Sequence, residues 1–188
     1  MSPVKTITIL ARNNMTRYGK SIRPVIHWFR KDLRLTDNPA LSSAAESGHP
    51  VVAVYIFEDG YSDPWAPGSA SKWWLHYSLK TLNQSLKALG NSLVLRRGQP
   101  QEVLSELVTE TGATEVYCTS LTEPHAIKVD SELIHIFNKL SVRFRIFDGN
   151  LIFSPGSITT KNDEPYKVFT PFYKACLKKL PARAILPA

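Results

Sequence analysis

The 188-residue sequence lacks the glycine-rich loops that most nucleotide-binding α/β proteins use to hold phosphate. Neither G-x-G-x-x-G nor G-x-x-x-x-G-K-[ST] occurs, and such loops need glycine because backbone amides must approach the phosphates closely. The G-x-S-x-G turn of α/β-hydrolases is also missing. These absences argue against dinucleotide dehydrogenases, nucleoside triphosphatases and α/β-hydrolases.

Metal-ligand motifs and long apolar runs are missing as well. The five histidines form no H-x-x-x-H or H-E-x-x-H motif, and Cys118 and Cys176 lie too far apart to form a metal-binding pair. We therefore expect no metal site, and reduced thiols in a cytoplasmic protein. No apolar run approaches the about 18 residues that a membrane-spanning helix needs, so we expect no membrane contact.

Positive charge is concentrated at the two ends of the chain. The formal net charge is +7, but residues 1–34 carry eight basic residues and one acidic residue, and residues 160–188 carry six and two. The region between them is mildly acidic, so we do not expect the folded domain itself to bind DNA. Residues 1–23 hold five basic residues and no acidic one. They predict a disordered basic extension, with a transit peptide as the alternative.

Short apolar runs alternate with helical patterns from residue 25 onward. Asn38 followed by Pro39 predicts the start of the first helix, because asparagine caps helices and proline suits their first position. Gly90 and Gly112 predict the ends of later helices. Five strands are expected at VIHWF (25–29), VVAVYIF (51–57), SLVLRR (92–97), TEVYCTS (114–120) and VRFRIF (142–147).

Strict alternation of strands and helices predicts an α/β fold. We expect a three-layer, doubly wound, five-stranded parallel sheet of Rossmann-like type over residues 24–150. Residues 151–188 contain five prolines and scattered aromatics, and they predict an extended arm with one short helix near residues 171–180. In open sheets of this kind, ligands bind beyond the carboxyl ends of the strands.

The turn after the first expected strand reads RKDLR, at residues 30–34, and carries charge where related folds carry glycine. Two interpretations are open. In one, Asp32 forms salt bridges with Arg30 and Arg34 and fixes the turn. In the other, the cationic side chains form a clamp for an anionic or planar ligand.

Two other features are expected to be structural. The adjacent tryptophans of KWWL (72–75) point to different faces of the expected helix, so we expect one of them to pack into the core. His27 lies inside a strand and is expected in the core, whereas His76 and His135 are expected on helix surfaces.

Several long segments together resemble one known family. WFRKDLRLTDNPAL, VVAVYIFE, GSASKWWLHYSLKTLNQSLKALG, LRRGQPQEVL, GATEVY and PYKVFTPFYKACL follow one another in the order found in the N-terminal antenna domain of DNA photolyases and cryptochromes. The match covers roughly residues 25–181 and is nearest to bacterial photolyases that repair cyclobutane pyrimidine dimers.

The resemblance implies a light-harvesting domain that holds an antenna chromophore, such as 8-hydroxy-5-deazaflavin, FMN or methenyltetrahydrofolate. The segment LTEPHA departs from both known patterns. His125 and Ala126 stand where the folate-binding group has an Asn-Glu pair, and Leu121 stands where the deazaflavin-binding group has an Asp. The residues that would line the chromophore site are Arg30, Lys31, Asp32, Arg34, Phe57, Glu58 and Glu123.

The same resemblance implies that the FAD site and the DNA-binding groove lie in a helical C-terminal domain, which this chain lacks. We therefore expect a truncated photolyase that cannot repair damaged DNA alone, with no catalytic residue of its own. The alternatives are a stand-alone flavin-, deazaflavin- or folate-binding module, or the partner of a separately encoded helical FAD domain. The arm aromatics Tyr166, Phe169, Phe172 and Tyr173 should then be exposed and favour self-association.

Overall fold

A computed structural model gives the fold of the chain, and it describes residues 16–17, 20–21, 23–58, 66–180 and 186. Its centre is one sheet of five parallel strands in the order β5-β4-β3-β6-β7. The sequence therefore predicted the doubly wound topology correctly. The strands are β3 (Val25–Phe29), β4 (Val51–Phe57), β5 (Leu93–Arg97), β6 (Glu115–Thr119) and β7 (Arg143–Phe147).

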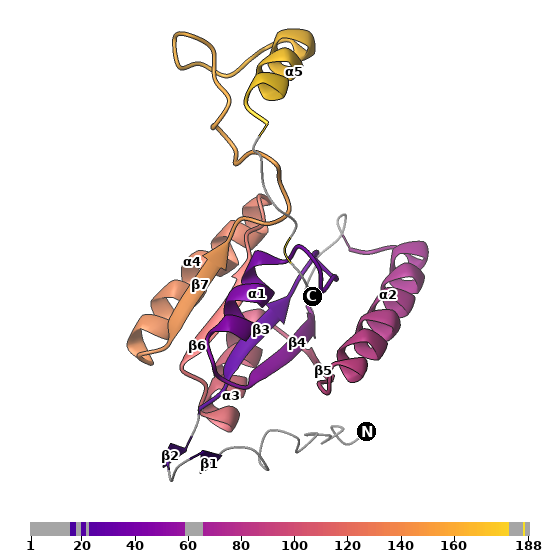
Figure 1. Cartoon of the computed structure of the whole chain (residues 1–188), viewed down its shortest axis with the longest axis vertical. Helices are drawn as coiled ribbons and strands as arrows, with labels where there is room; N and C mark the ends of the chain where they lie inside the picture. Colours follow the sequence, from indigo (N-terminus) through magenta and orange to yellow (C-terminus); the bar gives the residue numbers. More distant parts are fainter. Residues whose placement is uncertain (1–15, 18–19, 22, 59–65, 181–185, 187–188) are drawn as a thin grey trace.

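Four helices cover the two faces of this sheet (Figure 1). Residues of β3, β4 and β6 such as Ile26, Val54 and Val116 form the main core cluster with the third and fourth helices. The alternate residues of the same strands, among them Phe29 and Ala53, pack on the opposite face. The helices are α1 (Pro39–Glu46), α2 (Ser69–Ala88), α3 (Pro100–Thr111) and α4 (Pro124–Lys139).

The strand composition explains which strands lie at the centre. Every residue of β3 is buried, as expected for a parallel strand covered on both faces. The outer strands β5 and β7 are only partly buried and carry arginines, which protect an exposed sheet edge from pairing with other chains.

The helix ends follow the signals in the sequence. The Asn38 side chain accepts a hydrogen bond from the Leu41 amide, which confirms it as the N-cap of α1. Pro39, Pro100 and Pro124 each stand in the first turn of a helix. Gly112 ends α3 with a φ of 68°, a left-handed conformation that favours glycine.

Helix α2 differs from the expectation. It begins at Ser69, directly after Gly68, and no side chain caps it. Both tryptophans are exposed, with Trp73 at 62% and Trp74 at 71%, so the prediction that one packs into the core is wrong. The buried residues of α2, Leu79, Leu82 and Leu86, all lie in its second half, and the tryptophans lie in its first half.

The two ends of the chain lie outside the sheet. The prediction of a disordered extension concerns residues that lie mostly outside the described part. The described residues of this region form β1 (Thr16–Arg17), which pairs with β2 (Lys20–Ser21). The arm that follows β7 extends beyond the carboxyl edge of the sheet and carries α5 (Phe169–Lys178), none of whose residues is buried (Figure 1). Among the described residues, no helix is long and apolar enough to cross a membrane.

Candidate functional site

The carboxyl edge of the sheet brings three turns together. The strands β3 and β6 are parallel neighbours at the centre of the sheet. From β3 the chain adds strands on one side, and from β6 it adds them on the other, and ligand sites of open α/β sheets form at such a switch point. Lys31, after β3, forms an ion pair with Glu123, after β6. His125 at the start of α4 lies 3.5 Å from Glu58, after β4. The three turns that were expected to meet therefore do meet.

Asp32 fixes the first turn from the inside. Its buried carboxylate accepts hydrogen bonds from the backbone amide of Arg30 at 2.9 Å, the Asn38 side-chain amide at 3.1 Å and the Thr119 hydroxyl at 2.6 Å. The idea of a carboxylate that fixes the turn was right, but its partners were wrong, because neither guanidinium of the turn bonds to Asp32. Asp32 links the β3 turn to the end of β6 and is covered by protein.

The Arg30 guanidinium is held by contacts within the protein. Its Nη1 lies 3.0 Å from Asp130 on α4 and donates to the Thr119 carbonyl oxygen at 3.3 Å. The guanidinium also stacks over the Trp28 ring, 4.4 Å from its centroid. Both side chains of the ion pair are nearly inaccessible, with 4% of Arg30 and 11% of Asp130 exposed. Burial raises the pKa of Asp130, although the Arg30 charge acts in the opposite direction.

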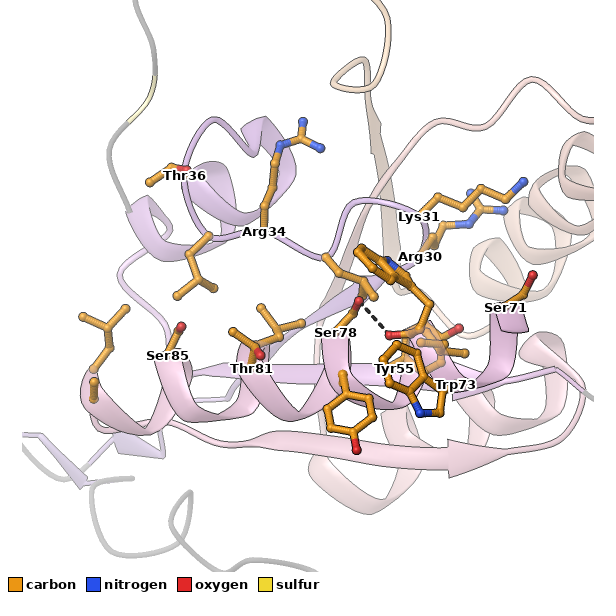
Figure 2. A pocket seen from close by; sticks show the side chains of 18 residues that line it. Arg30, Lys31, Arg34, Thr36, Tyr55, Ser71, Trp73, Ser78, Thr81 and Ser85 are labelled. Carbon is orange, nitrogen blue, oxygen red and sulfur yellow. Dashed lines mark hydrogen bonds between the residues drawn. The ribbon is translucent and has the colours of Figure 1, made fainter. Parts of the chain in front are cut away.

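Arg34 is held by neutral oxygens. Its guanidinium donates to the carbonyl oxygens of Asp37 and Gly149 and to the side-chain oxygen of Asn150. Figure 2 shows this side chain pointing away from α2. Arg34 thus ties the first turn to the loop after β7. Three segments of the chain approach closely at Gly149. A Cβ at this position would lie 3.1 Å from Pro39 Cδ and from Thr119 Cγ2.

The outer rim of the site carries the exposed charges. The Lys31 and Glu123 side chains are 60% and 47% exposed, and the hydrogen bond from Lys31 lowers the pKa of Glu123. Phe57 is half-buried, with the Arg97 guanidinium 5.7 Å from its ring centroid. Of the seven expected site residues, Lys31, Glu58 and Glu123 lie together at this rim. Phe57 borders it, and Arg30, Asp32 and Arg34 are engaged in holding the turn.

An open groove of about 1230 Å³ runs between the first turn and α2. Figure 2 shows Arg30 and Lys31 near the end of the groove that Ser71 forms, and Thr36 near the end that Ser85 forms. We call these the strand-end half and the far half of the groove. Among the described residues, the lining contains no carboxylate. It consists mainly of apolar, aromatic and hydroxyl side chains, including Leu33, Leu35, Tyr55, Trp73, Trp74, Tyr77, Ser78, Thr81 and Leu89.

Sequence reasoning missed two groups of residues here. Asp130 holds Arg30, and it was detectable as a carboxylate within the otherwise apolar stripe of Ala126, Leu133 and Phe137 on α4. The aromatic lining of the groove was missed because the tryptophans were expected to be structural, with one of them in the core.

Two buried groups near the site are chemically inert. His27 is buried as expected, and neither ring nitrogen has a hydrogen-bond partner among the described residues. Burial lowers the pKa of His27 to about 4, although the Asp32 charge acts in the opposite direction. Burial also raises the pKa of Cys118 to about 12, so this thiol stays protonated. Within the described ranges, no three potential ligands gather in a way that could hold a metal ion.

Comparison with known proteins agrees with this architecture. A deoxyribodipyrimidine photo-lyase of Agrobacterium fabrum is 43% identical over 152 residues, which cover 81% of this chain and 31% of that protein. Cryptochrome-1 of Arabidopsis thaliana is 33% identical over 153 residues, which cover 81% and 22%. The crystal structure of a bacterial class III photolyase from Agrobacterium tumefaciens superposes with a TM-score of 0.81 at 40% identity, covering 88% of this chain and 34% of that one.

The match is confined to one part of these longer proteins. The chain spans about a third of the length of the two photolyases. A family model described as DNA photolyase matches residues 25–188, which include the whole sheet and the arm. The chain therefore belongs to the DNA photolyase family.

Proposed function

We propose that this chain is the chromophore-binding, light-harvesting domain of a photolyase-type flavoprotein and does not repair pyrimidine dimers alone. The observation that carries the proposal is the combination of the family match with an open, aromatic groove at the carboxyl edge of the sheet. The division into an antenna domain at 24–150 and an interdomain arm at 151–188 is part of this proposal.

The strand-end half of the groove suits a planar heteroaromatic ring. Trp73, Trp74 and Tyr55 offer apolar ring faces, and Ser71 offers a hydroxyl group. Lys31 provides a cation at the same end, and its partner Glu123 is exposed, so an anionic group of the ligand can replace that partner at little cost. When bound, the chromophore supplies absorption of light, and the protein binds and orients it and limits its contact with water.

Direct measurement can identify which chromophore binds. FMN, 8-hydroxy-5-deazaflavin and methenyltetrahydrofolate all share a planar ring, and each has a distinct absorption band. We expect one of them to bind with a red-shifted or sharpened band, because the ring leaves water for an apolar site. Titration of the purified chain followed by absorption spectroscopy identifies the ligand. Failure of all three to bind would reject the antenna function.

A matched pair of variants locates the site. Trp73→Ala with Trp74→Ala removes the aromatic faces of the strand-end half and should weaken binding at least about tenfold, as loss of stacked aromatic anchors typically does. Leu89→Ala removes a comparably exposed apolar side chain from the far half and should leave binding unchanged. Equal effects of both changes would place the ligand elsewhere.

Repair activity is proposed to require the FAD-binding helical domain, because the chain corresponds to about a third of the photolyases it matches. We expect no cleavage of thymine dimers by the chain alone under blue light with added FAD and a reductant. Activity under those conditions would contradict the proposal. The second candidate, a helical FAD domain supplied by a separate chain, predicts that activity appears when the helical part of the Agrobacterium relative is added.

A further inference from the structure

The structure leaves two complementary apolar surfaces uncovered on the same chain. The first is the arm helix α5, on which Phe169, Phe172, Tyr173 and Leu177 are all exposed. Their spacing of three and four residues places them on one side of the helix. Lys174 and Lys178 lie on the opposite side, so the helix presents an apolar stripe with its charges directed away from it.

The second surface is the far half of the groove. Ser78, Thr81, Ser85 and Ala88 recur along α2 at spacings of three and four residues and line this half with small side chains. Leu35 and Leu89 flank them. Small side chains allow a second helix to approach closely, within the 8–10 Å that packed helices adopt. A ten-residue helix is about 15 Å long, which matches the α2 segment from Ser78 to Leu89.

We propose that two copies of this chain exchange their arms, with α5 of each copy lying in the far half of the groove of the other. The apolar stripe of α5 meets the apolar and hydroxyl lining of the groove, and its lysines face solvent. Among the described residues, the α2 side chains that line the far half are uncharged, so the docked face of α5 needs no charge of its own. The proposal goes beyond antenna binding and leaves the strand-end half of the groove free.

The arm is anchored in a way that favours a second copy over its own groove. At its start, Asp148 accepts hydrogen bonds from Ser120 and Ser154. Near its end, the carbonyl oxygen of Leu186 accepts from the Asp37 amide at 2.9 Å. These bonds hold α5 beyond the edge of the sheet, far from α2 of the same chain (Figure 1). Docking on another copy requires neither anchor to break.

The covered area is sufficient for a stable dimer. Aromatic side chains bury about 150–250 Å² each when fully covered, and α5 offers three that are exposed. About half of this aromatic surface is still exposed on α5, and reciprocal exchange covers two helices and two grooves, so the total is on the order of 1,300 Å², at the lower end of standard protein interfaces. Exchange of identical elements also gives the closed two-fold symmetry that most homodimers have.

A disulfide between chains tests the contact directly. We would mix a Ser85→Cys, Cys176→Ser chain with the wild-type chain, so that a bond between residues 85 and 176 can form only between copies. Mild oxidation should give a covalent dimer, and Cys118 does not interfere because it is buried. Gln84→Cys with Cys176→Ser is the matched control, because Gln84 is exposed beside Ser85 but does not line the groove. Equal yields from both mixtures, or no covalent dimer, would overturn the proposal.

Two further outcomes decide between the possible occupants. The Ser85→Cys chain alone, with its native Cys176, should cross-link to a dimer, and a cross-linked monomer would show back-folding and reject exchange. Sedimentation equilibrium tests the apolar side of α5. The double variant Phe169→Asp with Tyr173→Asp should weaken the dimer at least about 100-fold, since two central aromatic anchors are lost. Lys174→Asp with Lys178→Asp, on the opposite side of α5, should leave it intact. A wild-type chain that is monomeric at 100 µM, or equal effects of both pairs, would reject the proposal, and neither measurement depends on a chromophore.

Discussion

Arg30 and Lys31 are neighbours in the first turn, and each forms an ion pair with a carboxylate at or just before α4. The Arg30–Asp130 pair is almost completely buried, whereas the Lys31–Glu123 pair is exposed on both sides. A buried pair is costly to break because the remaining charge has no water around it. An exposed pair contributes little to stability and exchanges partners easily. The difference assigns the first pair to the fold and leaves the second available to a ligand.

The largest expected effect is the loss of the buried partner. Asp130→Ala leaves the Arg30 guanidinium buried without a counter-charge, and we expect the free energy of unfolding to fall by about 3–5 kcal/mol. Urea unfolding followed by circular dichroism measures this change. Arg30→Met with Asp130→Leu removes both charges and should cost much less. If Asp130→Ala cost no more than the double variant, the pair would not have the structural role assigned to it.

The next effect is the pH dependence of the free energy of unfolding that the buried His27 causes. Above pH 6.5, His27 is neutral in both the folded and the unfolded chain. As the pH falls from 6.5 to 4, the unfolded chain binds a proton that the folded chain excludes, because the pKa of the folded His27 is about 4. The free energy of unfolding should therefore fall by on the order of 3 kcal/mol across this window.

Comparison with His27→Leu isolates this contribution. The variant should lose the part of the pH dependence that lies between pH 6.5 and 4, while slopes caused by carboxylates persist in both proteins. Parallel stability curves for the two proteins would show that folding does not lower the pKa of His27.

A smaller effect is expected for the bond between the β6 end and the first turn. Thr119→Val keeps the side-chain shape and removes the hydroxyl that donates to Asp32 at 2.6 Å. We expect a loss of about 1–3 kcal/mol, because the buried carboxylate loses one of its three hydrogen bonds. Thr119→Ser retains the hydroxyl and should recover part of this loss, whereas equal losses would point to packing of the methyl group instead.

The smallest effect is expected at the rim. A double-mutant cycle of Lys31→Ala and Glu123→Ala should give a coupling energy of about 0.2–1 kcal/mol, which salt reduces further. Thermal or urea unfolding at low and high salt provides the measurement. A coupling energy as large as that of Arg30 with Asp130 would remove the distinction between the two pairs.

The sequence predicted most of the fold because its local signals agree with one another. Asn38 and Pro39 mark the start of α1, and the apolar run at 51–57 marks a strand that is covered on both faces. The tryptophans were misassigned because periodicity shows which residues share a helix face but not where a helix leaves the sheet. The buried residues of α2 all lie in its second half, so the regular apolar pattern continues beyond the buried part of the helix.

The candidate site was predicted in location but only partly in residue roles. The rule that ligands bind at the carboxyl ends of strands placed Lys31, Glu58 and Glu123 correctly at one rim. It could not separate Arg30 from Lys31, because their roles depend on Asp130, which lies 100 residues further along the chain. The partners of Asp32 were missed for the same reason, since Thr119 approaches it only in the folded sheet.

Gly149 has a consequence for how chains of this family can diverge. Its backbone carbonyl accepts from Arg34, and a side chain at this position would press on Pro39 and Thr119. The segments that contain Gly149, Pro39 and Thr119 can therefore pack this closely only because residue 149 has no side chain. A natural relative that keeps proline and threonine at the two contacting positions should also keep glycine here, and one that gains a larger residue should have changed at least one of its neighbours.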